Sequence, residues 1–486
     1  MKTMQIHPDD NVAVALTDLT IGEAGATAAI PAAHKLAIRP VRRGATVIKY
    51  GQPIGVATTD IAAGEWVHVH NLATSLGELL DYEYAPATLT PEKLPPASFR
   101  GYRRPDGRVG TRNEIWILPT VGCVNRIAEL IAAEASREFG ILPNLDGIHA
   151  FPHPYGCSQL GDDHRRTQQI LANLADHPNA GGVLVLGLGC ENNNIAEFQK
   201  VLGSWDADRV KFLETQAVGD EISAGVAAVE QLAVHASRTP RTECTVAELS
   251  IGLKCGGSDA FSGITANPLV GRIADRLTAM GGSAVLTETP EMFGAETLLM
   301  ARAADREVFD GIVAMINDFK QYFRSHHQVI YENPSPGNKQ GGITTLEEKS
   351  LGCIQKGGGS AVTDVLPYGG RIRKTGLTLL AGPGNDLVAV TALAAAGCQL
   401  ILFTTGRGTP LGTLVPCLKI ATNEPLFRKK RNWLDFNAGS LLGGNGPEQL
   451  ADELFHRLLA TASGDRTKAE KMGFRDLTIF KGGVTL

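Results

Sequence analysis

The sequence predicts an α/β protein in which a small all-β domain at the N-terminus precedes a large α/β region of two subdomains. Three observations support this prediction. The chain has 486 residues, more than the ~250–300 at which a single core stops growing, so several domains are expected. Its first part contains short apolar segments separated by turn residues. From residue 99 onward, longer apolar runs alternate with helical stretches, which is typical of α/β folds.

The N-terminal domain is expected at residues 1–84. Strands are predicted at residues 12–16, 34–39, 45–50, 54–58 and 66–70, with turn residues such as those of 41–44 and 60–65 between them. Residues 85–98 are expected to form a linker, because they are rich in proline: Pro86, Pro91, Pro95 and Pro96. These features together predict a compact, barrel-like β unit joined to the rest of the chain by the linker.

The α/β region is expected to divide into subdomains 99–245 and 246–486, because residues 238–242 interrupt the pattern around Pro240. Buried strands are predicted at residues 115–118, 147–151, 182–188, 249–253, 284–286, 377–380 and 399–403. Helices are predicted at residues 124–139, 162–175, 195–201, 220–236 and 266–280.

Composition argues against several classes of function. The net charge is -5 and the longest basic run is only residues 428–431, so nucleic-acid binding is not expected. No stretch reaches the ~18 apolar residues of a membrane span, and the N-terminus lacks the apolar core of a signal peptide, so no membrane partner and a cytoplasmic location are expected. No phosphate-binding loop or G-x-G-x-x-G motif follows a strand, which disfavours nucleotide cofactors.

Four cysteines follow apolar runs within glycine-rich segments: Cys123, Cys157, Cys190 and Cys255. In open α/β sheets, ligands bind beyond the carboxyl ends of the strands, where these thiols are expected. Cysteine is also a small apolar residue that fills tight corners. Near acids and His153, however, the same four thiols fit a metal-ligand set. The residues alone leave both interpretations open.

Further polar residues follow other predicted strands. Glu288 supplies a carboxylate, while Asn385 and Asp386 supply an amide and an acid. Arg407 lies in a glycine-rich loop, where its guanidinium suits a substrate carboxylate or a structural ion pair. These residue types at the ends of strands predict a site for a small polar anion.

Three smaller signals complete the set of candidate residues. Lys339 lies in the proline-rich loop 333–339 and offers an ammonium to an anionic oxygen, and Asp259 follows the strand that carries Cys255. His68 and His70 are two residues apart on a predicted strand, so both imidazoles are expected on one face, where they would suit one metal ion. Such pairs also arise by chance.

Long segments of the chain resemble the altronate/galactarate dehydratase family, and within it the altronate dehydratases. The resemblance rests on residues 155–164 (YGCSQLGDDH), 187–193 (GLGCENN), 255–259 (CGGSD), 290–296 (PEMFGAE), 333–339 (NPSPGNK), 404–410 (TTGRGTP) and 482–486 (GGVTL). It extends to the N-terminal unit, which is similar to an SAF (β-clip) domain through residues 48–51 and 68–71. The one departure is Pro154, where the family is expected to carry threonine.

The resemblance implies dehydration of D-altronate to 2-dehydro-3-deoxy-D-gluconate in galacturonate breakdown, with Fe²⁺ as cofactor and Mn²⁺ as a possible substitute. The His-x-His pair favours altronate over galactarate as the substrate. Such a reaction must remove the C2 proton and expel the C3 hydroxyl, and a divalent metal stabilises the enediolate that forms. We assign Arg407 to the substrate carboxylate, and Glu288 or His153 to proton transfer.

The metal ligands are expected among Cys157, Cys190, Cys255, His68 and His70. If three of the cysteines are ligands, an iron–sulfur cluster is favoured, because thiolates select such clusters. If the histidines and an acid are ligands, a mononuclear iron or manganese site fits better. The sequence does not choose between these two cases.

Three alternative functions stay open at this point. The protein could dehydrate another sugar acid such as galactarate, or bind a sugar acid without catalysis. It could also be a carbon–sulfur lyase similar to sulfolactate-cleaving enzymes, although those are assembled from separate chains. A homodimer is expected because it is the commonest state of soluble enzymes.

Overall fold

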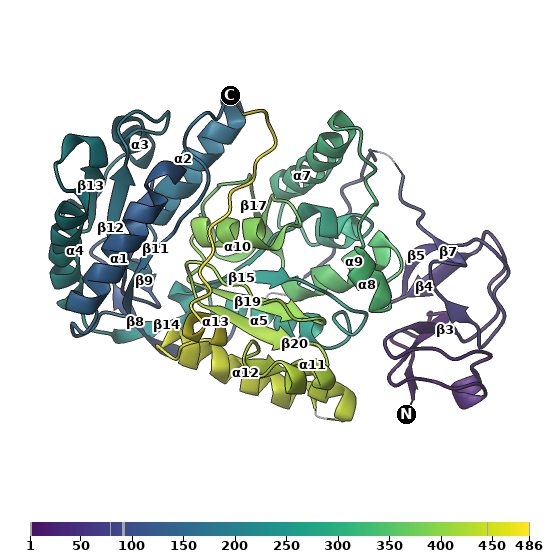
Figure 1. Cartoon of the computed structure of the whole chain (residues 1–486). Coiled ribbons are helices and arrows are strands. Elements are labelled where there is room, and N and C mark those ends of the chain that lie inside the picture. The colour runs from purple at the N-terminus through teal and green to yellow at the C-terminus, as the bar shows by residue number, and fades with distance from the viewer. Residues whose placement is uncertain (1, 78, 90–92, 445, 486) are drawn as a thin grey trace.

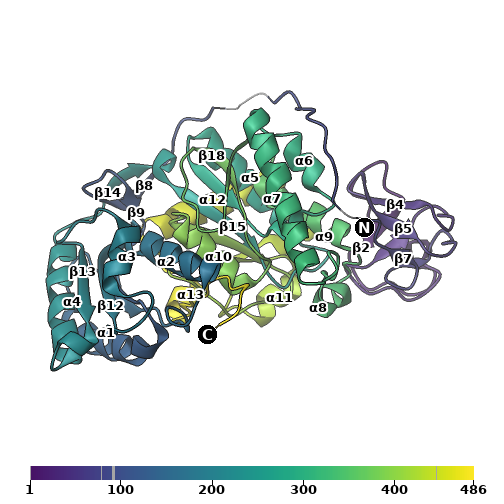
Figure 2. The same cartoon turned by 90° about the horizontal axis from the view of Figure 1, so that it is seen from above.

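The computed structural model describes residues 2–77, 79–89, 93–444 and 446–485. Pro91 of the predicted linker and Leu486 of the C-terminal motif lie outside these residues. The N-terminal β unit lies at one end of the molecule, a four-stranded α/β unit lies at the other, and the largest sheet lies between them (Figures 1 and 2). No helix in the described part of the chain is long and apolar enough to cross a membrane.

The N-terminal unit consists of two antiparallel sheets, in the orders β1-β2-β3-β6 and β4-β5-β7, which confirms the predicted all-β domain. The strands are β1 Thr3–Met4, β2 Val12–Ala15, β3 Lys35–Ala37, β4 Thr46–Lys49, β5 Gln52–Ala57, β6 Trp66–Val67 and β7 Leu72–Ala73, with a short turn of helix η1 at Glu23–Gly25.

The strand predicted at residues 66–70 is shorter than expected. It ends at Val67, and His68 and His70 lie in the turn that follows. Asn71 closes this turn, because its side-chain Oδ1 accepts a hydrogen bond from the His68 backbone N–H at 3.0 Å and its own backbone N–H donates to the His68 carbonyl at 3.0 Å. The alternation of a strand therefore does not apply to the two imidazoles, and the premise that put them on one face is wrong.

The linker region runs along the C-terminal part of the chain. The backbone N–H groups of Ala87 and Leu94 donate to the carbonyls of Ala301 and Ala279. From β8 the chain enters a three-stranded antiparallel sheet of order β14-β8-β9, which holds together the beginning and the end of the second unit. These strands are β8 Ser98–Arg103, β9 Val109–Gly110 and β14 Thr242–Thr245.

The second unit is a parallel four-stranded sheet of order β11-β10-β12-β13 with helices packed against it. Its strands are β10 Glu114–Pro119, β11 Gly147–Ala150, β12 Ala180–Gly187 and β13 Val210–Glu214. Its helices are η2 Gly122–Val124, α1 Asn125–Phe139, α2 Gly161–Ala175, α3 Ile195–Leu202, η3 Thr215–Ala217 and α4 Glu221–Ser237.

The C-terminal unit contains a seven-stranded parallel sheet of order β17-β18-β16-β15-β19-β20-β21. Its strands are β15 Ser250–Cys255, β16 Ser283–Leu286, β17 Val362–Leu366, β18 Gly376–Leu380, β19 Leu400–Thr405, β20 Cys417–Ala421 and β21 Phe436–Asn437. Because all of these strands run parallel, their carboxyl ends lie along one edge of the sheet.

Helices cover this sheet. They are η4 Val246–Glu248, α5 Ala266–Ala279, η5 Thr289–Met292, α6 Glu296–Met300, α7 Arg306–Ser325, α8 Pro336–Gln340, α9 Leu346–Cys353, η6 Ile354–Gly357, α10 Asp386–Ala395, α11 Glu424–Lys429, η7 Ala438–Gly443, α12 Pro447–Ala462 and α13 Lys468–Lys471. All five helices predicted from periodicity are present, each end within one residue of its expected position.

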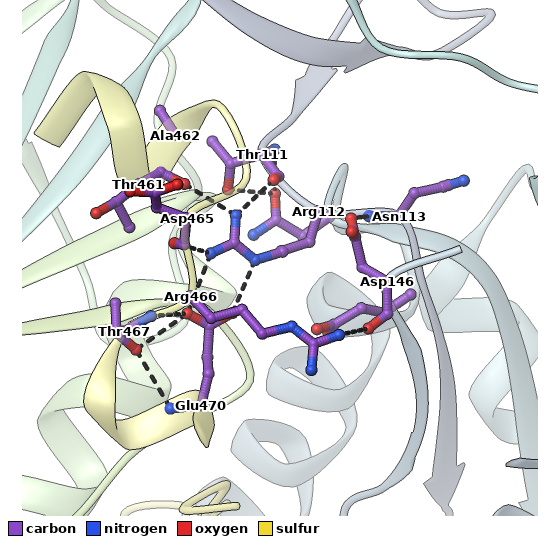
Figure 3. Close-up of polar contacts among 12 residues, drawn as sticks. Thr111, Arg112, Asn113, Asp146, Thr461, Ala462, Asp465, Arg466, Thr467 and Glu470 are labelled. Atoms are coloured by element: carbon purple, nitrogen blue, oxygen red, sulfur yellow. Dashed lines mark hydrogen bonds and ion pairs between the residues drawn. The ribbon is translucent and has the colours of Figure 1, made fainter. Parts of the chain in front are cut away.

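The second and C-terminal units are joined by a buried arginine, Arg112, which is 1% exposed. Its guanidinium donates to both carboxylate oxygens of Glu470, at 2.7 and 3.0 Å, and to the carbonyls of Thr461 and Asp465, both at 2.9 Å (Figure 3). A buried bidentate pair of this kind fixes the relative orientation of two elements. Here it fixes α12 and α13 against the strand that opens the four-stranded sheet.

A second buried ionic contact holds the N-terminal unit against the C-terminal unit. The carboxylate of Glu348, on α9, accepts from Lys35 and Lys49, each at 2.8 Å. Lys35 also donates to the carbonyl of Gly342 and the hydroxyl of Thr344, both at 2.8 Å. All three charged side chains are at most 1% exposed. The β unit is therefore attached through a desolvated, fully hydrogen-bonded ion triad.

Candidate active site

The carboxyl ends of the central strands bring charged side chains together at one edge of the large sheet. Cys255 is the last residue of β15, Glu288 follows β16, and Asp386 opens α10 after β18. The ammonium of Lys254 contacts the Glu288 carboxylate and lies 2.8 Å from Asp386 Oδ1. Glu288 adopts a left-handed conformation with φ 73°. For a residue other than glycine this backbone conformation is strained, and such residues are concentrated at functional sites.

At the centre of this edge lies a thiol–carboxylate cluster, which consists of Cys255, Glu291 and Cys353. The Cys255 and Cys353 sulfurs lie 3.2 and 3.1 Å from Glu291 Oε2 and 3.4 Å from each other. All three side chains are buried, and their ligand atoms lie within 4.8 Å of one another. Within the described ranges of the chain, this is the only group of three such residues close enough to hold one metal ion.

Three buried lysines surround the thiol–carboxylate cluster. Lys349 Nζ lies 2.8 Å from Glu291 Oε1, and Lys356 Nζ donates to Cys255 Sγ at 2.9 Å. Burial alone would raise the pKa of Glu291, but Lys349, Lys254 and Lys356 hold that pKa well below its usual range. The cluster is therefore an anionic centre within a cationic shell.

The same surroundings affect the other acids of the site. A hydrogen bond from Cys353, assisted by the ammonium groups of Lys356 and Lys254, lowers the pKa of the Cys255 thiol although burial opposes the shift. Burial and the neighbouring Glu291 charge raise the pKa of Glu288 well above its usual range. The site thus favours the thiolate form of Cys255 and the neutral form of Glu288.

A pocket of about 930 Å³ opens beside the cluster. Cys255, Glu291 and Lys349 are part of its lining. The other polar residues of the wall are Ser258, Glu332, Asn333, Ser335, Asn338, Lys339, Asn385, Asp386, Thr409 and Asp476. Because amides, hydroxyls and charged groups form much of this wall, the pocket suits a small ligand with several polar groups.

Several predicted residues lie at this pocket and others do not. Lys339, Asn385, Asp386 and Cys255 line it. Glu288 lies directly behind it and is fully buried. Asp259 is also buried and does not line this pocket. Its carboxylate accepts hydrogen bonds from Thr422, Ser262 and Asn423, so it ties the loop after β15 to the loop after β20.

Arg407 lies on a neighbouring surface. Its guanidinium donates to Gln340 Oε1 at 2.7 Å, and it lines a second hollow of about 700 Å³ between the N-terminal unit and α11. The side chain of His153 is buried in the second unit, where Nε2 lies 2.7 Å from the Pro119 carbonyl and Nδ1 accepts from the Tyr155 N–H at 3.2 Å. Burial lowers the pKa of His153 to about 4. Both ring nitrogens are therefore engaged by the backbone.

The five predicted metal ligands occupy three separate places. Cys255 belongs to the thiol–carboxylate cluster, whereas Cys157 and Cys190 are exposed in loops of the second unit. His68 is buried in the N-terminal unit, where its ring stacks on Trp66 and its Nδ1 lies 3.3 Å from the Thr344 hydroxyl. The exposed ring of His70 packs against the edge of the same tryptophan.

The residues that sequence reasoning missed are Cys353, Lys349 and Lys356, together with the role of Glu291. Lys349, Cys353 and Lys356 do not follow a strand, so an argument from strand ends could not find them. The spacing of Lys349, Cys353 and Lys356 could have indicated that the three side chains act together, since residues at i, i+4 and i+7 share one face of a helix. Here that face, on α9 and η6, points at Cys255 and Glu291.

Comparison with known protein families matches almost the whole chain in three parts. Residues 1–75 match the altronate/galactarate dehydratase SAF domain. Residues 101–237 match the second domain of D-galactarate dehydratase/altronate hydrolase, and residues 246–485 match the C-terminal domain of D-galactarate/altronate dehydratase. The first range contains both antiparallel sheets of the N-terminal unit, and the last contains the candidate active site.

Individual relatives match over the full length. The chain is 54% identical to altronate dehydratase of Bacillus subtilis, with 99% of each chain covered, and 52% identical to altronate dehydratase of Escherichia coli, with 100% of each covered. It is 34% identical to the galactarate dehydratase (L-threo-forming) of Escherichia coli, over 98% of this chain and 96% of that one. With all three family domains matched in order and relatives aligned from end to end, the chain belongs to the altronate/galactarate dehydratase family.

Proposed function

We propose that this protein is a hydro-lyase that dehydrates D-altronate to 2-dehydro-3-deoxy-D-gluconate. The observation that carries the proposal is the end-to-end identity of 52–54% to two altronate dehydratases, against 34% to a galactarate dehydratase. The polar pocket beside the thiol–carboxylate cluster supports it, because an aldonate presents one carboxylate and several hydroxyls to the protein.

The pocket offers groups for each part of such a substrate. Lys339 is partly buried at the wall and has no ion-pair partner among the described residues, so its ammonium is available to the substrate carboxylate. Ser258, Asn333 and Asn385 offer hydroxyl and amide groups to the substrate hydroxyls. Because Arg407 lies in another hollow, Lys339 replaces it as the residue assigned to the carboxylate.

The cofactor is proposed to be Fe²⁺, and the donors of the thiol–carboxylate cluster fit it. Two thiols and one carboxylate form a mixed soft and hard set, which favours iron over the harder Mn²⁺. Lys356 stabilises the thiolate form of Cys255, which is the form that binds metal. When bound, the ion would supply a Lewis acid that stabilises negative charge on the substrate carboxylate and the adjacent hydroxyl.

Proton transfer is assigned to two groups on the pocket wall. Asp386, held by Lys254, accepts the C2 proton. Lys349 donates a proton to the C3 hydroxyl, which leaves as water, and the resulting enol takes a proton at C3 to become the 2-keto acid. Glu288 does not reach the pocket, and it acts as a positioning residue through its contact with Lys254. His153 takes no part in this scheme.

The assignment is tested with Asp386→Asn and Lys349→Met, each measured against D-altronate under anaerobic conditions with Fe²⁺. Loss of a positioned acid or base lowers kcat by about 10²–10⁴-fold. Asp476→Asn, which also changes an acid of the pocket lining, is the matched control and is expected to change kcat by less than about threefold. Variants that keep wild-type kcat would exclude these two residues from proton transfer.

Galactarate is the second candidate substrate, favoured by the 34% identity to a galactarate dehydratase. A panel of both acids separates the two: preferred turnover of galactarate would replace the proposal, and binding of either acid without turnover would favour a non-catalytic sugar-acid-binding protein. We further propose a homodimer in the cytoplasm. The dimer is proposed because it is the commonest state of soluble enzymes, and light scattering tests it. Cell fractionation tests the location.

A further inference from the structure

The second unit carries a group of exposed cysteines that the proposed reaction does not use. Cys123, Cys157 and Cys190 are exposed, whereas the other five cysteines of the chain are buried. Free cysteine is among the residues most often buried in proteins. Three exposed thiols in one domain therefore call for an explanation other than packing.

The three cysteines lie at one edge of one sheet. They follow β10, β11 and β12, which are adjacent and parallel in the order β11-β10-β12. Each thiol therefore lies beyond the carboxyl end of its strand, in the unit opposite the N-terminal domain (Figure 1). No residue of 101–237 lines the pocket beside the thiol–carboxylate cluster, so this edge is a separate place.

Backbone hydrogen bonds tie the three cysteine loops to one another. The N–H of Gly122 donates to the Tyr155 carbonyl at 2.9 Å, next to Cys123 on one side and two residues from Cys157 on the other. The N–H of Asn193 donates to the Gly156 carbonyl at 3.1 Å, and the N–H of Ser158 donates to the Asn192 side chain at 2.9 Å. Each flank of Cys157 is thus fixed to the loop of a neighbouring cysteine.

The glycine beside Cys157 is required by this close approach. Gly156 has φ +100°, and a Cβ there would lie 1.9 Å from the Thr120 carbonyl oxygen. The buried carboxylate of Glu191 braces the same loops, because it accepts from the Thr120 hydroxyl at 2.6 Å and from the N–H groups of Leu188 and Gly189. The backbone segments that carry the three cysteines are therefore held close to one another.

Three helix N-termini also face this edge. Helix α1 begins two residues after Cys123, α2 four residues after Cys157, and α3 five residues after Cys190. The N-terminus of a helix carries a partial positive charge, which stabilises thiolates and bound anions. Three helix N-termini beside three cysteines therefore favour an anionic ligand that is bound by the cysteine sulfurs.

We propose that Cys123, Cys157 and Cys190 bind a [4Fe–4S] cluster through three thiolates, with the fourth iron open to solvent or a small ligand. Thiolates select iron–sulfur clusters, and three protein ligands leave one iron of such a cluster free. On binding, each thiol loses one proton and forms one iron–sulfur bond, with no change in the electron count of the cluster. The proposal does not depend on the identity of the sugar-acid substrate.

The test is ligand exchange under anaerobic conditions. The full-length protein is incubated with a preformed [4Fe–4S] cluster capped by four small thiolates. Three protein thiols displace three capping thiolates, which leave as thiols with the released protons. After desalting, iron, acid-labile sulfide and the sulfide-to-iron absorption are measured. The wild type is expected to retain about four iron and four sulfide per chain, the content of one such cluster.

Variants locate the cluster. Cys123→Ser, Cys157→Ser and Cys190→Ser are each expected to lower retention at least about fivefold, and the triple variant to abolish it, by loss of thiolate ligands. Cys244→Ser, at a buried cysteine of β14, and the double variant Cys255→Ser/Cys353→Ser are expected to retain the wild-type amount.

Two results would overturn the proposal: a wild-type protein that retains no labile sulfide, or a triple variant that retains as much as the wild type. Loss of the cluster only in Cys255→Ser/Cys353→Ser would likewise overturn it and would place the cluster at the other site. Turnover of D-altronate is measured separately on the same samples, so failure of the proposed function and failure of this inference are distinguishable.

Discussion

The buried triad of Lys35, Lys49 and Glu348 gives the sharpest prediction about how the N-terminal domain is held. The two ammonium groups outweigh burial and lower the pKa of Glu348 from 4.5 to about 2. One pKa unit corresponds to about 1.4 kcal/mol, so the ionised carboxylate stabilises the folded state by about 3 kcal/mol. Because the pKa is lowered on folding, this contribution is complete above pH 4.5 and is lost as the pH falls toward 2.

The substitution Glu348→Gln removes the charge and leaves two ammonium groups buried without a counter-ion. Breaking a buried pair in this way costs about 3–5 kcal/mol. The N-terminal domain is therefore expected to unfold or detach first. Differential scanning calorimetry should show a lower or split transition, and limited proteolysis should release residues 1–84 faster. Glu23→Gln, at an exposed ion pair with Lys2 in the same domain, is the control and should leave both readouts unchanged.

An apolar triple variant refines the test. Replacement of a buried ionic cluster by apolar residues of similar size is often neutral or stabilising. Lys35→Met, Lys49→Met and Glu348→Leu together should therefore recover most of the transition temperature lost in Glu348→Gln. A Glu348→Gln variant that melts like the wild type at pH 7 would contradict a stabilising role for this ion triad. So would a variant whose stability still falls between pH 4.5 and 2 as steeply as that of the wild type.

Three further predictions follow from the other contacts. Arg112→Met leaves Glu470 buried without its partner and should destabilise the junction of the second and C-terminal domains by about 3–5 kcal/mol. Urea unfolding should show this as a lower midpoint. Arg126→Met, at an exposed ion pair, should leave the midpoint unchanged. Cys353→Ser should lower the Fe²⁺ content measured by metal analysis after anaerobic loading, and an unchanged content would show that Cys353 is not a ligand. Lys339→Met should raise KM for D-altronate by about 10–150-fold, the effect of losing a charged hydrogen bond, while Lys200→Met on the surface of α3 should leave it unchanged.

Periodicity predicted much of the fold because the central strands and five helices have regular apolar patterns. It did not indicate β20, whose buried Lys419 interrupts the apolar run and donates to the Thr409 carbonyl. The prediction that the strand at residues 66–70 extends to His70 was wrong for a different reason. The hydrogen bonds of Asn71 close a turn there, and a turn stabilised by one side chain leaves no trace in apolar periodicity.

The candidate site was predictable where it follows strand ends. Cys255, Glu288, Asn385 and Asp386 were identified because the carboxyl ends of parallel strands share one edge. Cys353 lies on a helix, so its approach to Cys255 depends on how α9 packs against the sheet, which local sequence does not specify. Arg407 satisfied the same strand-end rule, and its loop reaches the pocket through Thr409, but the Arg407 side chain itself points to Gln340.

The most direct test of the central claim is anaerobic turnover of D-altronate by the Fe²⁺-loaded enzyme, with galactarate measured in parallel and with Glu291→Gln compared to the wild type. The wild type is expected to form 2-dehydro-3-deoxy-D-gluconate from D-altronate in preference to galactarate. Glu291→Gln, which removes the carboxylate of the thiol–carboxylate cluster, is expected to lose at least about 100-fold in kcat. No turnover of D-altronate by the wild type, or full turnover by Glu291→Gln, would contradict the central claim.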